Sequence, residues 1–208
     1  KVLGGLRKAE RGHPMSLYLV GVLDFQGQQW DAAAQRLERV LSMMPGHVQS
    51  QLLLGIIRYT KGDLETADEY LSNVLAAAPG NLQARKVLAA TRIKMREPKR
   101  AIEALLPVAQ QGDPQTLALL GSAYMLDGDL EQGQALLDQA VTNAPDAAAL
   151  RTQLALSLLA GGKTDKAIDE LRRRQRYVDD PVDDPDKGYL GPDGRWAQPC
   201  PVWEGSVD

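Results

Sequence analysis

Few residues of this chain have the types and spacing that catalysis or metal binding would require. The two histidines, His13 and His47, lie 34 residues apart and occupy the same place in successive turns. Neither has a cysteine or an acidic cluster at the spacing of metal ligands. No Gly-x-Ser-x-Gly nucleophile motif and no glycine-rich phosphate loop occurs. We therefore predict a non-enzymatic protein with no catalytic, cofactor-binding or metal-binding residues.

An acidic run from Asp179 to Asp186 is the other candidate for metal chemistry. It holds five aspartates and two prolines, but it lacks the spacing of a twelve-residue calcium loop and its final glutamate. We interpret the run as a solvated or salt-bridged linker, with an acidic metal site as the alternative. The prolines exclude a continuous helix, so residues 178–208 are predicted to be an acidic, Pro/Gly/Trp-containing, non-helical tail.

Cations gather in a single stretch of 16 residues. They are Arg85, Lys86, Arg92, Lys94, Arg96, Lys99 and Arg100. Two interpretations remain open: an ordinary solvated face, or an anion-binding site for an acidic peptide or a sugar. The net charge of the whole chain is −3, which gives no support to general binding of nucleic acid.

The segment 48–81 reads as one complete pair of helices that could position such residues. Two apolar patterns of helical period flank Gly62-Asp63, and Pro79-Gly80-Asn81 closes the second pattern. A glycine at position 55 and an alanine at position 67 would let the two backbones approach closely. One such hairpin cannot bury its own apolar faces, so it needs neighbours.

Two series of small residues place those neighbours at the same phase. Positions 21, 55, 89, 121 and 155 hold Gly or Ala, and so do positions 33, 67, 101, 133 and 167. Both series advance by 34, 34, 32 and 34 residues. The predicted units are 14–47, 48–81, 82–113, 114–147 and 148–177, with residues 1–13 as the end of a preceding repeat helix. Pro107 should kink or shorten the second helix of the third unit.

These residues resemble the tetratricopeptide repeat, which has a 34-residue period. The resemblance implies an all-α, right-handed superhelical solenoid of about five helix-turn-helix repeats with an irregular C-terminal tail. The phrases NLQARKVLAA and AALRTQLALSLLAGG look like the array of bacterial PEP-CTERM-system TPR lipoproteins. That resemblance implies a scaffold for exopolysaccharide production and export, periplasmic and lipid-anchored through a segment preceding Lys1. No apolar run is long enough to cross a bilayer.

In stacked hairpins the first helices line a concave groove, which is the predicted site for a protein or peptide partner. The predicted partner-binding residues are Tyr18, Phe25, Ile56, Tyr59, Lys86, Ile93, Lys94 and Met125. An apolar first half followed by a basic middle suits a peptide with apolar anchors followed by acidic groups. For Tyr18, Phe25 and Tyr59, packing between repeats is an equally open interpretation.

Further hypotheses concern the tail, one ion pair and the function. The C-terminal tail could dock in it, with aspartates on the cations and Trp196 and Trp203 on apolar residues. Asp24 and Arg58 occupy equivalent positions and could pair across adjacent first helices. Alternative functions are a chaperone-type adaptor for C-terminal peptides, disfavoured because the Asn and Lys pairs of such adaptors are missing, and an enzyme-associated domain.

Overall fold

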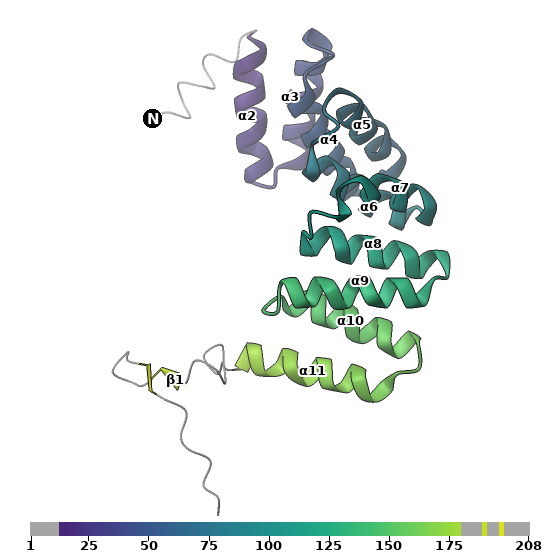
Figure 1. Ribbon diagram of the computed structural model, residues 1–208. Coiled ribbons are helices and arrows are strands. Elements are labelled where there is room, and N and C mark those ends of the chain that lie inside the picture. The colour runs from purple at the N-terminus through teal and green to yellow at the C-terminus, as the bar shows by residue number, and fades with distance from the viewer. Residues whose placement is uncertain (1–12, 180–188, 191–195, 198–208) are drawn as a thin grey trace, which may run out of the picture.

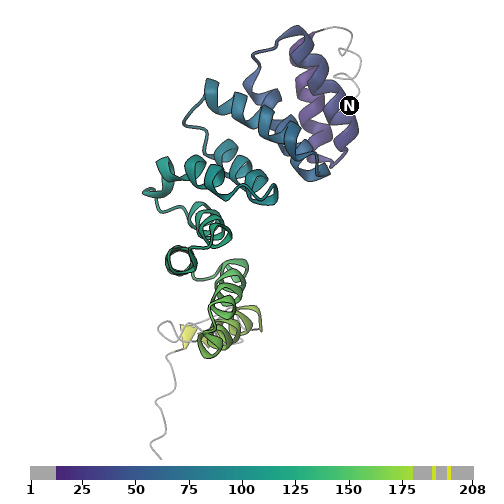
Figure 2. The same cartoon turned by 90° about the vertical axis from the view of Figure 1, so that its right-hand side faces the viewer.

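The protein folds as a continuous stack of helices. The computed structural model describes residues 13–179, 189–190 and 196–197, with side chains for residues 13–173. The helices follow one another down the molecule in chain order, and the turned view shows a curved path (Figures 1 and 2). They are α2 (Pro14–Gln26), α3 (Trp30–Met43), α4 (Val48–Lys61), α5 (Leu64–Ala77), α6 (Leu82–Lys94), α7 (Pro98–Ala109), α8 (Pro114–Asp127), α9 (Leu130–Asn143), α10 (Ala148–Ala160) and α11 (Thr164–Asp179). The predicted all-helical solenoid is confirmed.

The segment 48–81 forms the predicted helical hairpin from local chemistry. Gly62 ends α4 in the left-handed conformation, with φ of 83°, where a side chain would be strained. Asp63 then caps α5 by accepting a hydrogen bond from the Thr66 N–H at 3.4 Å. Asp129 caps α9 in the same way, through the Gln132 N–H at 3.0 Å. Each carboxylate satisfies an N–H that the helix leaves unpaired.

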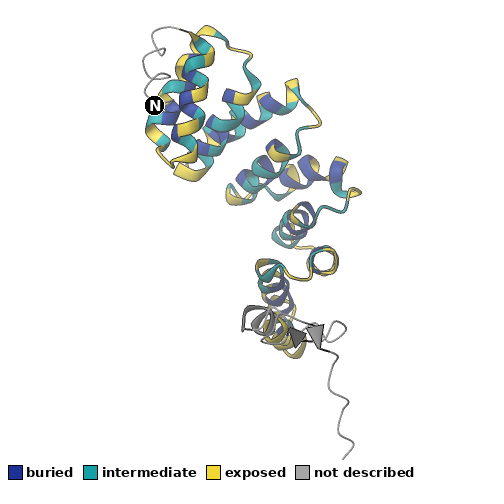
Figure 3. Ribbon diagram, turned by 90° about the vertical axis from the view of Figure 1, so that its left-hand side faces the viewer, coloured by how far each residue is buried: buried dark blue, intermediate teal, exposed yellow. Residues whose placement is uncertain are grey.

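The two series of small residues lie where paired helices touch. Every alanine in both series is fully buried, and Figure 3 shows that buried residues lie on the helix faces that meet neighbouring helices. A Cβ added at Gly55 would lie 2.7 Å from Leu71 Cγ. A Cβ added at Gly121 would lie 2.8 Å from the backbone oxygen of Gly133. The small residues therefore set the spacing between the helices of each unit.

One leucine position anchors the core of successive second helices. Leu37, Leu71, Leu105 and Leu137 are at most 1% exposed, because each packs between its own first helix and the next unit. The equivalent Leu171 on α11 is 37% exposed. The last described unit thus lacks the covering helix that the four preceding units have.

The carbonyls of the closing prolines are bound by a recurring donor on the next first helix. Gln51 Nε2 donates to the Pro45 oxygen at 2.9 Å, and Arg85 Nη2 donates to the Pro79 oxygen at 2.8 Å. Arg151 Nε donates to the Pro145 oxygen at 2.9 Å. Since Gln51, Arg85 and Arg151 occupy one repeat position, this bond fixes each turn against the helix that follows it.

The predicted pair of Asp24 and Arg58 is wrong. Asp24 binds Arg36 of its own unit, whereas Arg58 binds Glu38 at 2.6 Å. Glu38 lies on α3, the second helix of the preceding unit. The reason is directional: at this register a long side chain reaches back to the second helix of the preceding unit, and does not run alongside the neighbouring first helix.

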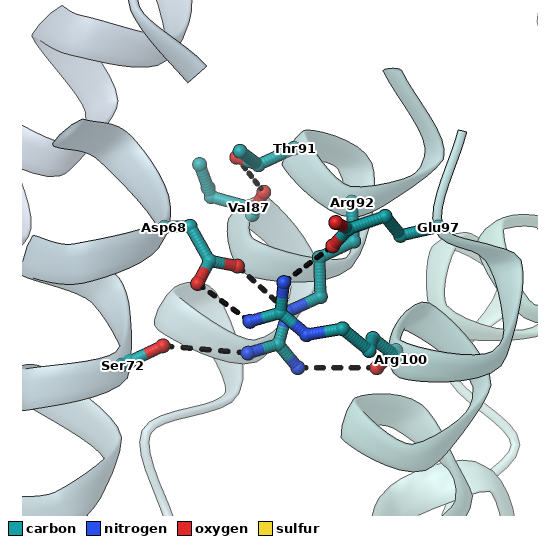
Figure 4. A network of polar contacts seen from close by, with 7 residues as sticks. All are labelled: Asp68, Ser72, Val87, Thr91, Arg92, Glu97 and Arg100. Atoms are coloured by element: carbon teal, nitrogen blue, oxygen red, sulfur yellow. Dashed lines mark hydrogen bonds and ion pairs between the residues drawn. The ribbon is translucent and has the colours of Figure 1, made fainter. Parts of the chain in front are cut away.

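Arg92 occupies the next equivalent position and makes a similar contact. Its Nε donates to Asp68 Oδ1 at 2.7 Å, and its Nη2 donates to Ser72 Oγ at 3.4 Å. Arg100 Nη2 also donates to Asp68, at 2.9 Å. Figure 4 shows both guanidinium groups converging on this carboxylate between α5, α6 and α7. Asp68 and Arg92 are largely buried, at 14% and 13% side-chain exposure.

The third unit and the C-terminal end depart from the regular pattern. Helix α7 continues through Pro107 and ends at Ala109; with 12 residues it is the shortest of the described helices. Helix α11 runs to Asp179, two residues beyond the predicted end of the fifth unit. In the tail, β1 (Tyr189–Leu190) pairs antiparallel with β2 (Trp196–Ala197). The predicted docking of the tail lies outside the described residues.

Candidate functional site

A pocket of about 540 Å³ lies on the face formed by the first helices. We call it the groove pocket. It is lined by Ile93, Lys94, Arg96, Ser122, Met125, Leu126 and Gln153, which belong to α6, the turn after it, α8 and α10. The three successive first helices that the sequence placed along one groove therefore share this site.

The floor of the groove pocket is apolar and supported by the core. Ile93 packs against the buried cluster that includes Leu105 and Leu120. Met125 packs on the next cluster, and a Cβ at Gly133 would lie 2.4 Å from Met125 Cγ. Gly133 therefore leaves the room in which Met125 lies. An apolar floor of this kind accommodates an aliphatic or aromatic side chain of a ligand.

One rim of the pocket is fixed by neutral hydrogen bonds. Gln153 Nε2 donates to Ser122 Oγ at 3.2 Å and so joins α10 to α8. Ser122 Oγ donates in turn to the Ala118 oxygen at 2.9 Å. These two side chains offer a polar edge that can hydrogen-bond to a peptide backbone.

The opposite rim carries two cations. Lys94 is exposed, and its Nζ lies 4.0 Å from the centroid of the Tyr59 ring on α4. This cation–π contact holds the ammonium group on the groove side. Arg96 is exposed and has φ of 62°, so it turns the chain just after α6 ends at Lys94. Among the described residues, neither cation has an ion pair.

Most other cations of the third unit are engaged within the chain. Arg85 donates to the Ala104 and Pro79 oxygens, both at 2.8 Å, and Lys86 pairs with Asp113 at 3.4 Å. Arg92 and Arg100 share Asp68. Of the seven cations that suggested an anion-binding site, only Lys94 and Arg96 line the groove pocket without an ion pair among the described residues, and Lys99 is exposed outside it.

The pocket brings together three of the predicted partner-binding residues: Ile93, Lys94 and Met125. Tyr59 adjoins them through Lys94. The others lie elsewhere: Lys86 pairs with Asp113, and half-buried Ile56 lies on α4.

Two predicted aromatic residues pack within the first units. Tyr18 meets the His47 ring edge-on at 4.8 Å between centroids, and Phe25 meets Trp30 at 5.3 Å. Both pack against the buried cluster of the first two units. These contacts favour the packing interpretation for Tyr18 and Phe25.

Four lining residues were not among the predicted partner-binding residues: Arg96, Ser122, Leu126 and Gln153. Arg96 carried a signal, because it belongs to the cation cluster. Gln153 carried a weaker one, since the equivalent positions 19, 53, 87 and 119 hold apolar residues. Gln153 is the polar residue at this repeat position, and it is the residue of α10 that lines the pocket.

The histidines have structural roles at helix starts. His47 Nδ1 accepts from the Ser50 N–H at 3.2 Å and caps α4. His13 Nδ1 accepts from the Met15 N–H at 3.3 Å at the start of α2. The interpretation of both as equivalent turn residues is confirmed. Within residues 13–173, no group of three His, Cys, Asp or Glu residues could hold a metal ion, and no described helix could span a membrane.

Comparison with protein families matches most of the helical array. One model described as tetratricopeptide repeat matches residues 58–123, and a second model with the same description matches residues 21–81 and 118–177. No curated protein matches the chain.

Solved structures show the same fold at low sequence identity. MamA from Desulfovibrio magneticus RS-1, residues 41 to the end, is 21% identical with a TM-score of 0.73, covering 81% of this chain and 97% of that one. TTC0263, a thermophilic TPR protein of Thermus thermophilus, is 21% identical with a TM-score of 0.66, covering 82% and 93%. The likeness extends over nearly the whole length of both relatives.

Proposed function

The chain belongs to the tetratricopeptide repeat family, and we propose that it is a non-enzymatic scaffold that binds a segment of a partner protein in the groove pocket. The observation that carries this proposal is the pairing of an apolar floor with two cations that have no ion pair among the described residues. Such a site selects a segment with an apolar anchor beside a carboxylate.

The lining residues assign a part of the ligand to each part of the pocket. Ile93, Met125 and Leu126 bury the apolar anchor. Lys94 and Arg96 bind the carboxylate of an acidic residue, while Gln153 hydrogen-bonds to the ligand backbone. Because Lys94 is exposed and rests on Tyr59, its charge contributes to selectivity and association rate as well as to affinity.

The test is selection from a displayed peptide library on the intact protein. Selected peptides should share an aliphatic or aromatic residue close to Asp or Glu. The variant Lys94→Glu should weaken their binding by roughly tenfold, as expected for loss of a charge-assisted contact.

Lys99→Glu is the matched control, because Lys99 is an exposed cation of the same unit that does not line the pocket. It makes the same change in net charge and should leave affinity nearly unchanged. Equal weakening by both variants would assign binding to general charge and reject the pocket.

A finer proposal concerns the setting in the cell. The resemblance of NLQARKVLAA and AALRTQLALSLLAGG to the PEP-CTERM-system TPR lipoproteins supports a role in a bacterial exopolysaccharide-export assembly. A periplasmic location, with a lipid anchor supplied by a segment before Lys1, belongs to the same proposal. Fusing the full-length gene product to a reporter that is active only in the periplasm tests it: reporter activity supports the proposal, and a fusion that is expressed but inactive rejects it.

A further inference from the structure

A second cavity, of about 520 Å³, lies in the last two units, between α9 and α11 over α10. We call it the second-helix cleft. Its floor is apolar, with Ala135, Leu154 and Leu158. Its other lining residues are polar, and all but Gln134 are charged: Glu131, Gln134, Asp138, Lys163, Lys166, Asp169, Glu170 and Arg173. It shares no lining residue with the groove pocket.

The earlier units show what occupies the equivalent place. Between the first two units, the guanidinium of Arg58 lies there and binds Glu38 at 2.6 Å. Between the second and third units, the guanidinium of Arg92 lies there and donates to Ser72 at 3.4 Å and to Asp68 at 2.7 Å. An arginine from the following first helix therefore fills this place in these two interfaces, whereas Tyr124 holds the equivalent position in the third interface.

The interface between the last two units has an acid at the place of Glu38 and no arginine at the place of Arg58 and Arg92. The repeat spacing that relates Ala67 to Gly133 and Ala89 to Ala155 also relates Ser72 to Asp138, Arg92 to Leu158 and Arg100 to Lys166. Asp138 therefore holds the place of Glu38 and Ser72. Leu158 holds the place of the two arginines, and its shorter side chain does not fill the space that a guanidinium fills elsewhere.

Among the described residues, the other charged side chains around the cleft do not form an ion pair with Asp138. Glu170 binds Arg151 at 2.9 Å and Arg173 at 3.3 Å, and Lys163 donates to Gln134 at 2.6 Å. Asp169 lies 4.0 Å from Arg172. Within residues 13–173, the side chains of Asp138, Glu131 and Lys166 have no ion pair. Asp138 and Glu131 lie two turns apart on α9, on the face that lines the cleft.

The geometry points to the second-helix cleft as a docking site for a partner protein that inserts an arginine side chain. The aliphatic part of that arginine packs on Leu154 and Leu158, and its guanidinium binds Asp138. The nearby cation Lys166 does not prevent this arrangement. In the interface between the second and third units, Arg92 and Arg100 share the single carboxylate of Asp68, the equivalent of Gln134, so one carboxylate in this part of an interface can bind two cations.

The probe for the test is N-acetyl-arginine-methylamide, titrated into the ¹⁵N-labelled intact chain and followed by amide chemical shifts. Residues of α9 and α11 that line the cleft should shift. The citrulline analogue has nearly the same shape without the charge, and it should bind roughly tenfold more weakly, as expected for loss of a charge-assisted hydrogen bond.

Two variants locate the contact. Asp138→Asn should weaken binding of the arginine probe to the level of the citrulline analogue. Asp146→Asn is the control, because Asp146 is an exposed acid in the turn before α10 and does not line the cleft. Leu158→Arg places within the chain the side chain that the first two interfaces have, so it should abolish probe binding and raise the melting temperature.

Several results would overturn the inference. They are equal binding of the two probes, unchanged binding to Asp138→Asn, shifts confined to residues outside the cleft, or no shifts at all. Because Asp138 is exposed, its amide variant tests the contact even if Leu158→Arg does not fold. Lys94→Glu should leave probe binding intact, so failure of the groove proposal and failure of this one are distinguishable.

Discussion

Gly121 on α8 and Gly133 on α9 let two helices of the array approach closely, and replacing Gly121 by alanine tests what that approach contributes. An added Cβ at Gly121 would lie 2.8 Å from the Gly133 backbone oxygen and 3.1 Å from Leu137 Cγ. A backbone oxygen within a helix cannot move aside as a side chain can. The two helices must therefore separate locally.

Two opposing terms give the size of the effect. Alanine in place of glycine inside a helix stabilises by about 1 kcal/mol. Overpacking a close contact costs about 1 to 3 kcal/mol, and the upper half applies here because the neighbour is backbone. The net expectation for Gly121→Ala is a loss of about 1 to 2 kcal/mol, or roughly 3 to 6 °C in melting temperature for a chain of this size.

Thermal and urea unfolding, followed by circular dichroism, measure this loss, and two matched glycines calibrate it. Gly55→Ala should lose less, because its added Cβ would meet the movable Leu71 side chain at 2.7 Å. Gly46→Ala should lose nearly nothing, because no atom lies within 4 Å of its added Cβ. A Gly121→Ala protein as stable as the wild type or more so, with unchanged amide shifts in α9, would refute the reasoning.

Two acids give further predictions. Asp68→Asn leaves the largely buried Arg92 guanidinium without its counter-charge, so urea unfolding should show a loss of about 2 to 4 kcal/mol. Asp113→Ala removes the cap of α8 and should lose about 1 to 2 kcal/mol at neutral pH. Burial raises the pKa of Asp113, but hydrogen bonds from Thr116 and the charge of Lys86 outweigh burial and hold that pKa below its usual value. Because the folded pKa is depressed, this contribution is complete above about pH 4 and is lost as pH falls through the folded pKa, so wild type and variant should converge in acid.

The repeat periodicity made the fold predictable, because it depends on residue size at fixed positions. Only small residues fit where paired helices touch, and the alanines at these positions are fully buried. The hairpin at 48–81 was equally predictable from the sequence, since Gly62 ends α4 and Asp63 caps α5. Such signals need no knowledge of distant contacts.

The polar contacts were less predictable, because a repeat position fixes where a side chain starts and not where it ends. Asp24 and Arg58 occupy equivalent positions, but each binds a second helix. Lys86 looked like a groove cation, but Asp113 neutralises it. Which cations of the groove can bind a ligand depends on which of them already form ion pairs within the chain. Sequence spacing alone does not predict those pairs.

Exposed Leu171 has a consequence for the order in which the array comes apart. Helix α11 lies at one end of the described stack, so fewer apolar contacts oppose its detachment than oppose that of any interior helix. We therefore expect local unfolding to begin at α11. Its amides should exchange hydrogen through frequent local openings, while the amides of α4 to α9 stay protected. The second-helix cleft lies between α9 and α11, so an arginine bound in it would hold α11 against α9 and slow hydrogen exchange of the α11 amides.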